Sequence, residues 1–278
     1  MYQAVLDECT ERGVKLDRSV GCRSIDELKA TLAEYADTNT LCLVGGGDGT
    51  LNLAANCLAH KTATLGVVPL GTGNSLARDL GIPAKIPEAI QIALEGKTEA
   101  IDLGQIGEQF FVNVATVGLT TDIAAELTVP MKRRFGKLVY GIAVSRALKK
   151  LTPFRLKLTL DGQPPKELEA IQLVIGNGRY HAGPFLLSFT SAITSGRLTV
   201  YAVEPAAKKE FLKMLPLLPV GLHGALKHVH SFEARAGTIE TDPAEKVIID
   251  GELGGTTPIT FSIAPGALRV RVPDKFKG

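Results

Sequence analysis

Two glycine-rich segments carry residues that could bind phosphate. Residues 44–52 read VGGGDGTLN and follow a short apolar run, and residues 67–81, VVPLGTGNSLARDLG, repeat this arrangement. A strand that runs into glycines and then into a helix places backbone N–H groups at the helix N-terminus, where phosphate binds readily. Adjacent parallel strands end at the same sheet edge, so we expect both loops to grip one nucleotide.

Asp48 brings a negative charge into the first of these loops. A carboxylate repels phosphate unless a cation lies between them, and Mg²⁺ prefers carboxylate and phosphate oxygens. We therefore predict an Asp48–Mg²⁺–triphosphate arrangement; the alternative is that Asp48 caps a helix. The segment matches neither GxGxxG nor the Walker A pattern. In the second loop, Thr72 and Asn74 are candidate neutral partners of the nucleotide, and helix capping is the alternative for Asn74 and Ser75.

Two acids near the C-terminus could serve proton transfer. The segment VIIDGELGG places Asp250 and Glu252 two residues apart, so a regular strand would present both on one face. A carboxylate can accept the proton of a hydroxyl group as that group attacks a phosphate. The alternative is a hairpin turn at Asp250-Gly251, with both acids facing solvent.

The predicted secondary structure changes near residue 101. Before it, predicted helices alternate with short apolar strands, which indicates βαβ units and a mainly parallel sheet. After it, alternating apolar and polar residues predict antiparallel strands, interrupted by two helical intervals. The predicted helices are 1–13, 24–36, 51–60, 73–81, 86–96, 137–151 and 207–218, and the predicted strands include 40–45, 64–70, 154–160, 170–176, 197–203, 246–250 and 259–264.

Composition excludes several classes of protein. No apolar run approaches the ~20 residues of a membrane span, and the start of the chain is not a signal peptide. The four cysteines fit no zinc pattern, so a reducing cytosol is expected. Aromatic residues make up 5% of the chain and tryptophan is absent, which argues against base stacking and hence nucleic-acid binding.

Charge divides the chain into unlike parts. Residues 1–130 carry 9 Lys+Arg and 17 Asp+Glu, a net of −8, and residues 131–278 carry 22 and 12, a net of +10. The basic run 131–137 and the lysines at 149, 150, 208, 209 and 213 predict peripheral contact with an anionic membrane. The apolar segment 211–226 is interpreted first as a packed helix and second as a lipid-facing one.

Together, GGDGTLN and PLGTGNSLARDLGIP resemble the catalytic domain of diacylglycerol-kinase-like lipid kinases, a group that includes bacterial diacylglycerol and phosphatidylglycerol kinases and, more distantly, sphingosine and ceramide kinases. The segments FVNVATVGLTTDI, IGNGRYHAGPF and IDGE extend this resemblance. It implies α/β plus β architecture. An N-terminal NAD kinase/diacylglycerol kinase-like nucleotide domain (1–100) precedes a C-terminal antiparallel β-sandwich (101–278), whose last residues return to the first domain.

The resemblance also implies site residues. Asp250 and Glu252 would form the catalytic acidic pair, with Glu252 the favoured proton acceptor, and Asp48 would serve Mg²⁺. ATP would be bound by Gly46, Gly47, Asp48, Gly49, Thr50, Leu51, Asn52, Gly71, Thr72, Gly73 and Asn74. The family begins with a strand and an NPxSG-like loop, whereas residues 1–13 resemble the following helix, so we expect the first strand to be lacking. Ser195 stands where many members carry a Mg²⁺-binding aspartate, so no structural Mg²⁺ is predicted there.

The resulting expectation is a cytoplasmic, membrane-peripheral enzyme of phospholipid biosynthesis. It would use ATP and Mg²⁺ to phosphorylate a lipid hydroxyl, with diacylglycerol as the default substrate. Two alternatives stay open. One is an NAD kinase, which shares a GGDGT loop; the other is a non-catalytic nucleotide- or lipid-binding homologue. A homodimer is left open as well.

Overall fold

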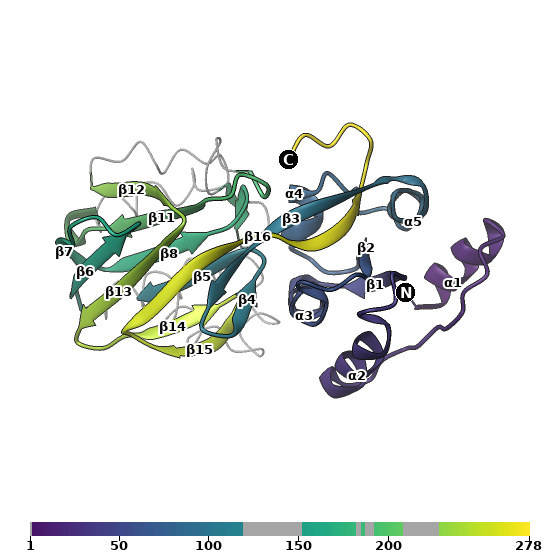
Figure 1. The fold of residues 1–278 in the computed structure, drawn as a ribbon, viewed down its shortest axis with the longest axis horizontal. Coiled ribbons are helices and arrows are strands. Elements are labelled where there is room, and N and C mark those ends of the chain that lie inside the picture. The colour runs from purple at the N-terminus through teal and green to yellow at the C-terminus, as the bar shows by residue number, and fades with distance from the viewer. Residues whose placement is uncertain (1, 119–151, 182–184, 187–191, 208–227) are drawn as a thin grey trace, which may run out of the picture.

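The computed structural model describes residues 2–118, 152–181, 185–186, 192–207 and 228–278 (Figure 1). The basic run 131–137, the other lysines expected at a membrane and the apolar segment 211–226 lie outside these residues. So do the helical predictions for 137–151 and nearly all of 207–218. In the part of the chain described, no helix combines the length and apolarity that crossing a membrane requires.

The N-terminal half packs helices against a short parallel ladder. Its elements are α1 (Tyr2–Glu11), α2 (Ile25–Tyr35), β1 (Leu41–Gly46), α3 (Asp48–Leu58), β2 (Thr64–Pro69), α4 (Ser75–Asp79) and α5 (Ile86–Glu95). Helix α2 begins where the sequence predicts, because the Ser24 hydroxyl oxygen accepts a hydrogen bond from the Glu27 N–H at 3.1 Å. Strand β2 is buried along its whole length, as an interior parallel strand should be.

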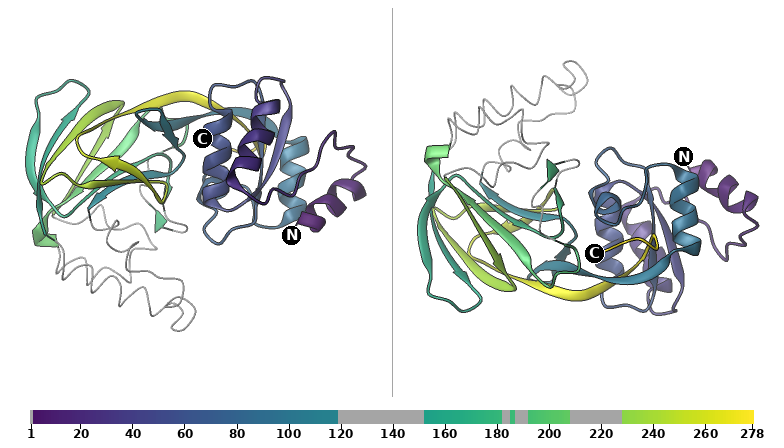
Figure 2. Two further views of the ribbon diagram at one scale, coloured as in Figure 1. Left: turned by 90° about the horizontal axis from the view of Figure 1, so that it is seen from below. Right: turned by 90° about the horizontal axis from the view of Figure 1, so that it is seen from above.

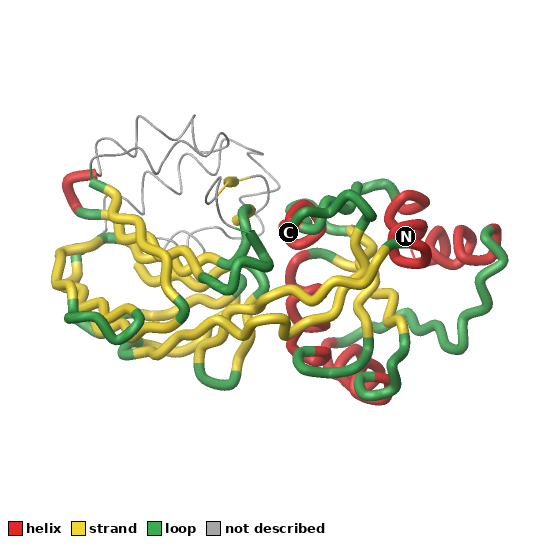
Figure 3. Tube along the Cα trace, turned by 45° about the horizontal axis from the view of Figure 1, so that its top comes forward, coloured by secondary structure: helices red, strands yellow, loops and turns green. Residues whose placement is uncertain are grey.

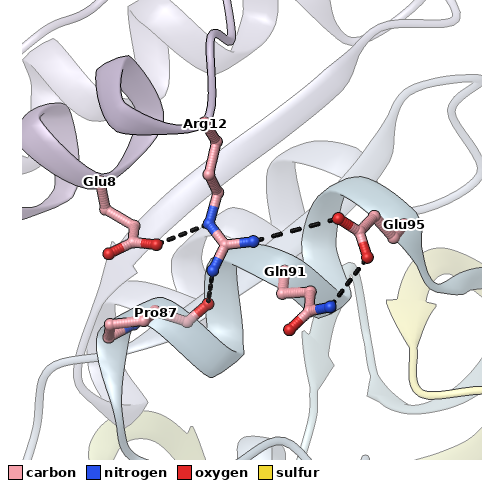
Figure 4. A network of polar contacts seen from close by, with 5 residues as sticks. All are labelled: Glu8, Arg12, Pro87, Gln91 and Glu95. Carbon is pink, nitrogen blue, oxygen red and sulfur yellow. Dashed lines mark hydrogen bonds and ion pairs between the residues drawn. The ribbon is translucent and has the colours of Figure 1, made fainter.

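The Arg12 side chain, directly after helix α1, forms the polar contacts between this helix and α5 (Figure 4). The Arg12 guanidinium contacts the Glu8 carboxylate at 2.6 Å, donates to the Pro87 carbonyl at 3.2 Å and lies 4.0 Å from Glu95. Gln91 donates to the other Glu95 oxygen at 2.9 Å. Below this polar layer, Cys9 and Ile90 share a small apolar cluster with Val68 of β2. Helix α1 therefore contacts α5 along one side, while most of its residues are exposed.

The C-terminal half is a β-sandwich. Its strands are β3 (Lys97–Ile106), β4 (Gln109–Phe111), β5 (Val114–Gly118), β6 (Phe154–Leu160), β7 (Lys166–Ala170), β8 (Gln172–Gly176), β9 (Tyr180–His181), β10 (Phe185–Leu186), β11 (Leu198–Val203), β12 (Val229–Ala234), β13 (Ala236–Asp242), β14 (Lys246–Ile249), β15 (Glu252–Thr256) and β16 (Ile259–Val272), with a short 3-10 helix at Pro205–Ala207. Alternate residues of the strands face a common apolar core that contains Phe111, Phe154 and Phe261.

Two large sheets hold most of these strands, and β9 pairs with β10 in a separate two-stranded sheet. One runs in the order β1-β2-β16-β13-β6-β7, with β3 beside β16 and β4 beside β3, and the other in the order β12-β11-β8-β5-β14-β15. The predicted class, an α/β domain followed by an antiparallel β-sandwich, is confirmed. Within the described residues, β1 is an edge strand of the first sheet, and β7 lies at the opposite edge.

Strands β3 and β16 connect the two halves. Figures 2 and 3 show this pair running from the sandwich into the α/β domain. Strand β16 pairs with β13 at Ile259↔Ile239, with β3 along most of its length, and in parallel with β2 at Val270↔Leu65. The C-terminal end of the chain thus returns to the α/β core, where Phe276 packs.

Candidate functional site

The two glycine loops touch each other through their backbones. Strands β1 and β2 are parallel and in register at Gly46↔Pro69, so both loops leave the same sheet edge. A Cβ atom built on Gly71 would lie 2.5 Å from the Gly47 Cα atom, closer than any side chain tolerates. Glycine is therefore required at this contact by lack of space, and the contact makes one continuous surface of the two loops.

The Asp48 carboxylate joins the loops. Its Oδ1 accepts a hydrogen bond from the Ser75 N–H at 2.6 Å, and its Oδ2 accepts one from the Asn74 N–H at 3.0 Å. The N-cap residue of its own helix α3 is Gly47, so Asp48 caps α4 instead. A negative charge at this helix N-terminus is stabilised by the helix dipole and by two orphan N–H donors.

Asn74 closes the second loop on itself. It has left-handed backbone angles, φ 51° and ψ 46°, and is the N-cap residue of α4 without a capping bond from its side chain. The side chain turns back instead: Oδ1 accepts from the Gly71 N–H and Nδ2 donates to the Gly71 carbonyl, both at 2.9 Å. Thr72, between them, is exposed. The loop is thus held rigid while its tip faces outward.

The predicted ATP contacts differ in accessibility. Gly49 is exposed, while Gly46, Gly47, Thr50 and Gly73 are half-buried. The Leu51 side chain is fully buried in the α/β core. Asn52 is 7% exposed, and its Oδ1 accepts a hydrogen bond from the Asn56 amide at 3.3 Å. The Leu51 and Asn52 side chains therefore belong to the packing of α3.

Asp250 lies in a two-residue hairpin turn. Strands β14 and β15 pair at Ile249↔Glu252, and positive φ angles at Asp250 (45°) and Gly251 (93°) match a type I′ turn. The expectation that a regular strand presents Asp250 and Glu252 on one face is wrong, because the turn separates them. Glu252 is exposed. The turn alternative was right about the hairpin and wrong about a solvent-facing Asp250.

The Asp250 carboxylate is enclosed by backbone. It accepts hydrogen bonds from the N–H groups of Val112 at 2.7 Å, Asn113 at 3.1 Å and Val114 at 2.8 Å. Burial raises the pKa of Asp250 to about 6, and these hydrogen bonds, together with the Asn113 side chain, oppose the rise. The residue as a whole is only half-buried, because its turn backbone reaches the surface. The enclosed carboxylate fastens the corner between β4 and β5.

Asn56 connects this corner to the first glycine loop. It lies on α3, two turns after Asp48, and binds the Phe110 backbone of β4 at both polar groups: Nδ2 donates to the carbonyl and Oδ1 accepts from the N–H, each at 2.9 Å. Figure 1 shows β4 beside α3. A short series of contacts therefore runs from Asp48 through α3, Asn56 and β4 to Asp250.

Sequence reasoning missed Asn56 because it sits among alanines and a leucine of an amphipathic helix, where a polar residue normally faces solvent. It also missed Asp79, whose Oδ1 accepts the Arg179 N–H at 2.8 Å. The available signal for Asn56 was its place in the otherwise apolar stretch 53–59. The signal for Asp79 was an acid in the last turn of a helix, where the dipole disfavours it.

The residues present fit a single-carboxylate contact with a metal ion. Within the described ranges, no three His, Cys, Asp or Glu side chains are grouped so that they could hold an ion. Each Asp48 oxygen accepts one backbone N–H, which leaves one further acceptor direction per oxygen. This donor set suits Mg²⁺ that keeps waters and phosphate oxygens as its other ligands. Ser195 has its hydroxyl on the Arg197 backbone.

Family models match both halves of the chain. A model of the diacylglycerol kinase catalytic domain matches residues 2–106, and a model of the YegS C-terminal NAD kinase beta sandwich-like domain matches residues 114–272. Among curated relatives, a diacylglycerol kinase of Mycobacterium tuberculosis is 31% identical, with 94% of this chain and 86% of the relative covered. One of Bacillus subtilis is 30% identical, with 84% and 76% covered.

Solved structures of kinases are also similar to this chain. A crystal structure of a diacylglycerol kinase from Bacillus anthracis aligns with a TM-score of 0.72 and 26% identity, over 90% of this chain and 84% of that one. An NAD kinase from Archaeoglobus fulgidus in complex with ATP aligns with a TM-score of 0.56 and 10% identity, over 99% and 90%, which is a likeness of fold alone. With both domain models matched and relatives at this identity over most of its length, the chain belongs to the diacylglycerol kinase family.

Proposed function

We propose that this protein is a lipid kinase that transfers the γ-phosphate of ATP to the hydroxyl group of diacylglycerol or a related lipid. One observation carries the proposal. The helix that leaves the first glycine loop is bound through Asn56 to the same β4–β5 segment that the Asp250 carboxylate holds. A phosphate-binding edge and an acidic hairpin are thereby tied to each other, although they come from opposite ends of the sequence.

ATP would lie on the surface made by the two loops. The first-turn N–H groups of an α-helix have no intrahelical acceptor, so Gly49 and Thr50 of α3 offer donors to phosphate oxygens. The exposed Thr72 adds a hydroxyl donor from the second loop. Asp48 and Asn74 keep the two loops at a fixed separation by the hydrogen bonds described above. Rigid donors favour phosphoryl transfer, which depends mainly on positioning and charge neutralisation.

Glu252 is assigned as the proton acceptor. It is exposed at the start of β15, next to the turn that Asp250 anchors. As the lipid oxygen attacks the γ-phosphorus, a P–O bond forms and the bond to ADP breaks. The hydroxyl proton passes to the Glu252 carboxylate. Asp250 serves this step as a positioning residue, because its acceptor sites are occupied by backbone N–H groups.

Mg²⁺ would neutralise charge on the triphosphate. Asp48 is the residue that would hold it, directly or through water, from the acceptor directions that its two backbone hydrogen bonds leave unused. This assignment gives Asp48 two roles. It joins the two loops, and it would hold the Mg²⁺ that neutralises the charge of the triphosphate next to them.

The lipid would be met at a membrane surface. The net charge of +10 in residues 131–278 supports contact with an anionic leaflet. All four cysteines are free thiols, in keeping with a cytoplasmic location. Co-sedimentation with vesicles of phosphatidylglycerol, compared with phosphatidylcholine, would measure this contact; equal binding to both would argue against it.

The deciding experiment is an acceptor screen with γ-³²P-labelled ATP and Mg²⁺. Diacylglycerol in mixed micelles, extracted membrane lipids and NAD are offered separately, and labelled products are separated by chromatography. Label in a lipid product supports the proposal. Label in NAD identifies an NAD kinase instead. ATP binding by calorimetry without transfer to any acceptor identifies a non-catalytic homologue.

A further inference from the structure

Helix α4 is held at both of its ends by aspartates. At its N-terminus, the Asp48 carboxylate of the first glycine loop accepts the N–H groups of Asn74 and Ser75. At its C-terminus, the helix's own last residue, Asp79, accepts the N–H of Arg179 at 2.8 Å. Residue 179 belongs to the sandwich, in the loop 177–179 between β8 and β9. This short helix therefore bridges the second glycine loop and the other domain.

The location of Asp79 calls for an explanation. The C-terminal end of a helix carries partial negative charge, so an acid there is unfavourable unless a donor compensates it. The backbone N–H of Arg179 supplies such a donor from the opposite domain. Because a backbone donor has no rotamers of its own, this hydrogen bond fixes the position of loop 177–179 more closely than a contact between two long side chains would.

Gly178 is fitted to Asp79. It is buried, and its φ of 79° lies where side chains are rarely found. A Cβ atom built on it would lie 2.8 Å from the Asp79 Oδ2 atom. The backbone conformation favours glycine, and a methyl group at this position would have to displace the Asp79 carboxylate. The loop and the carboxylate are thus matched in shape as well as in hydrogen bonding.

The loop 177–179 is connected to the acidic hairpin through strands β8 and β5. It follows β8, whose last residue Gly176 is paired with Val114 of β5. The N–H of Val114 donates to the Asp250 carboxylate, and its carbonyl accepts from the Asp250 N–H, both at 2.8 Å. A displacement of the loop would therefore pass through two paired strands to the turn that precedes Glu252.

We propose that Asp79 is a positioning residue that latches loop 177–179 of the sandwich to the helix following the second glycine loop, and so fixes where the acidic hairpin lies relative to bound ATP. The proposal rests on the lipid-kinase function proposed above. Together with Asn56, which ties α3 to β4, it attaches each of the two glycine loops to the sandwich.

The test compares Asp79→Ala with Asp79→Asn, which keeps an oxygen acceptor for the Arg179 N–H. Asp37→Ala is the matched control, because Asp37 is also in the α/β half and pairs only locally, with Lys61. The first readout is hydrogen exchange of the Arg179 amide, which needs no activity. We expect faster exchange in Asp79→Ala by about tenfold or more and near wild-type exchange in Asp79→Asn and Asp37→Ala.

The second readout is steady-state kinetics. Misplacing the hairpin should lower kcat of Asp79→Ala by about tenfold while KM for ATP changes by less than about twofold, and Asp79→Asn should restore most of kcat. If Asp79→Ala does not fold, Gly178→Ala disturbs the same contact from the other domain and should show the same loss of kcat.

Unchanged Arg179 exchange in Asp79→Ala overturns the latch. Loss of kcat in Asp79→Asn equal to that in Asp79→Ala, with the amide still protected, overturns its positioning role. A wild-type protein without kinase turnover refutes the proposed function instead, and the exchange measurement still decides the latch.

Discussion

Glu252 provides the sharpest test at the scale of single residues. Replacing it with Gln keeps the size of the side chain and removes its ability to accept a proton, so kcat should fall by about 100-fold or more. The fold should be unaffected, because Glu252 is exposed. Phosphate transfer to diacylglycerol and the thermal midpoint are measured together. Glu240→Gln, another exposed glutamate of the sandwich, is the control. Turnover of Glu252→Gln within about threefold of wild type, a range of about 0.7 kcal/mol, would remove Glu252 from the mechanism.

Asp250 should make stability depend on pH. Burial raises the pKa of its native-state carboxyl from 3.8 to about 6. Below pH ~4 both the native and unfolded states hold the proton. Between these pKa values the unfolded state releases it while the native state retains it, so the free energy of unfolding falls as pH rises. Above pH ~6 the native state bears the full cost of a buried charge.

Asp250→Asn removes this titration. The free energy of unfolding of the wild type, minus that of Asp250→Asn, should therefore decrease by about 1–3 kcal/mol between about pH 4 and pH 7. Urea denaturation at several pH values measures both proteins under the same conditions, so the other titrating groups cancel. A difference that stays constant or increases with pH would contradict the raised pKa.

At the scale of elements, the first turn of α3 can be probed with one methyl group. Gly49 is the second residue of this helix, and a Cβ atom built there meets nothing within 4 Å. Alanine is favoured over glycine inside helices by about 0.5–1 kcal/mol, so Gly49→Ala should keep or raise the melting temperature. If phosphate lies against this turn, the methyl group should weaken Mg–ATP binding by about tenfold, measured by calorimetry.

Gly71→Ala gives the contrasting result. Its methyl group would enter the backbone contact between the two loops, so it should lower the melting temperature itself. Unchanged ATP affinity in a stable Gly49→Ala protein would mean that ATP does not approach the first turn of α3. Equal melting temperatures for Gly71→Ala and wild type would mean that the two loops separate easily.

Local patterns predicted the helices α1 to α5 and seven strands, but not the long strand β3 or the strands β12 and β13. Long-range contacts account for the differences. The capping residues of α2 and the alternation in 154–160 were sufficient for those two elements. Strand β16, predicted as 259–264, extends to Val272. Pro265 and Gly266 resemble a stop signal, but a register shift between Ala264 and Leu268 lets the ladder continue past them. The sequence shows the proline; it does not show that β3 lies alongside to continue the pairing.

The candidate site also contains residues that local patterns predict and residues that they do not. The glycine loops were evident because their residue types are dictated locally, by backbone conformation and by the helix starts. The roles of Asn56 and Asp79 depend on partners 54 and 100 residues away, so no local pattern contains them. Asp250 and Glu252 were predicted to act as a pair, whereas the turn between β14 and β15 encloses one and exposes the other.

At the scale of the whole molecule, the two halves share a sheet. Strands β3 and β16 pair inside the sandwich and continue into the α/β domain, where β16 adjoins β2. Two separate apolar cores lie on either side of this bridge: Leu65 is fully buried in one and Ile239 in the other. Unfolding either core would leave half of the β3–β16 pair without a core to pack against. We therefore expect one cooperative thermal transition rather than two.

Cavity-forming substitutions in each core test this coupling. Leu65→Ala and Ile239→Ala should each cost about 2–5 kcal/mol, because both side chains are fully buried. If β3 and β16 couple the halves, each variant lowers the midpoint of the same single calorimetric peak, and near- and far-ultraviolet circular dichroism lose signal together. If the halves unfold independently, each variant moves a different part of the trace and leaves the other in place. Such a splitting would also weaken the argument that Asp79 and Asn56 act on a fixed arrangement of two domains, since the arrangement would then lack its main support.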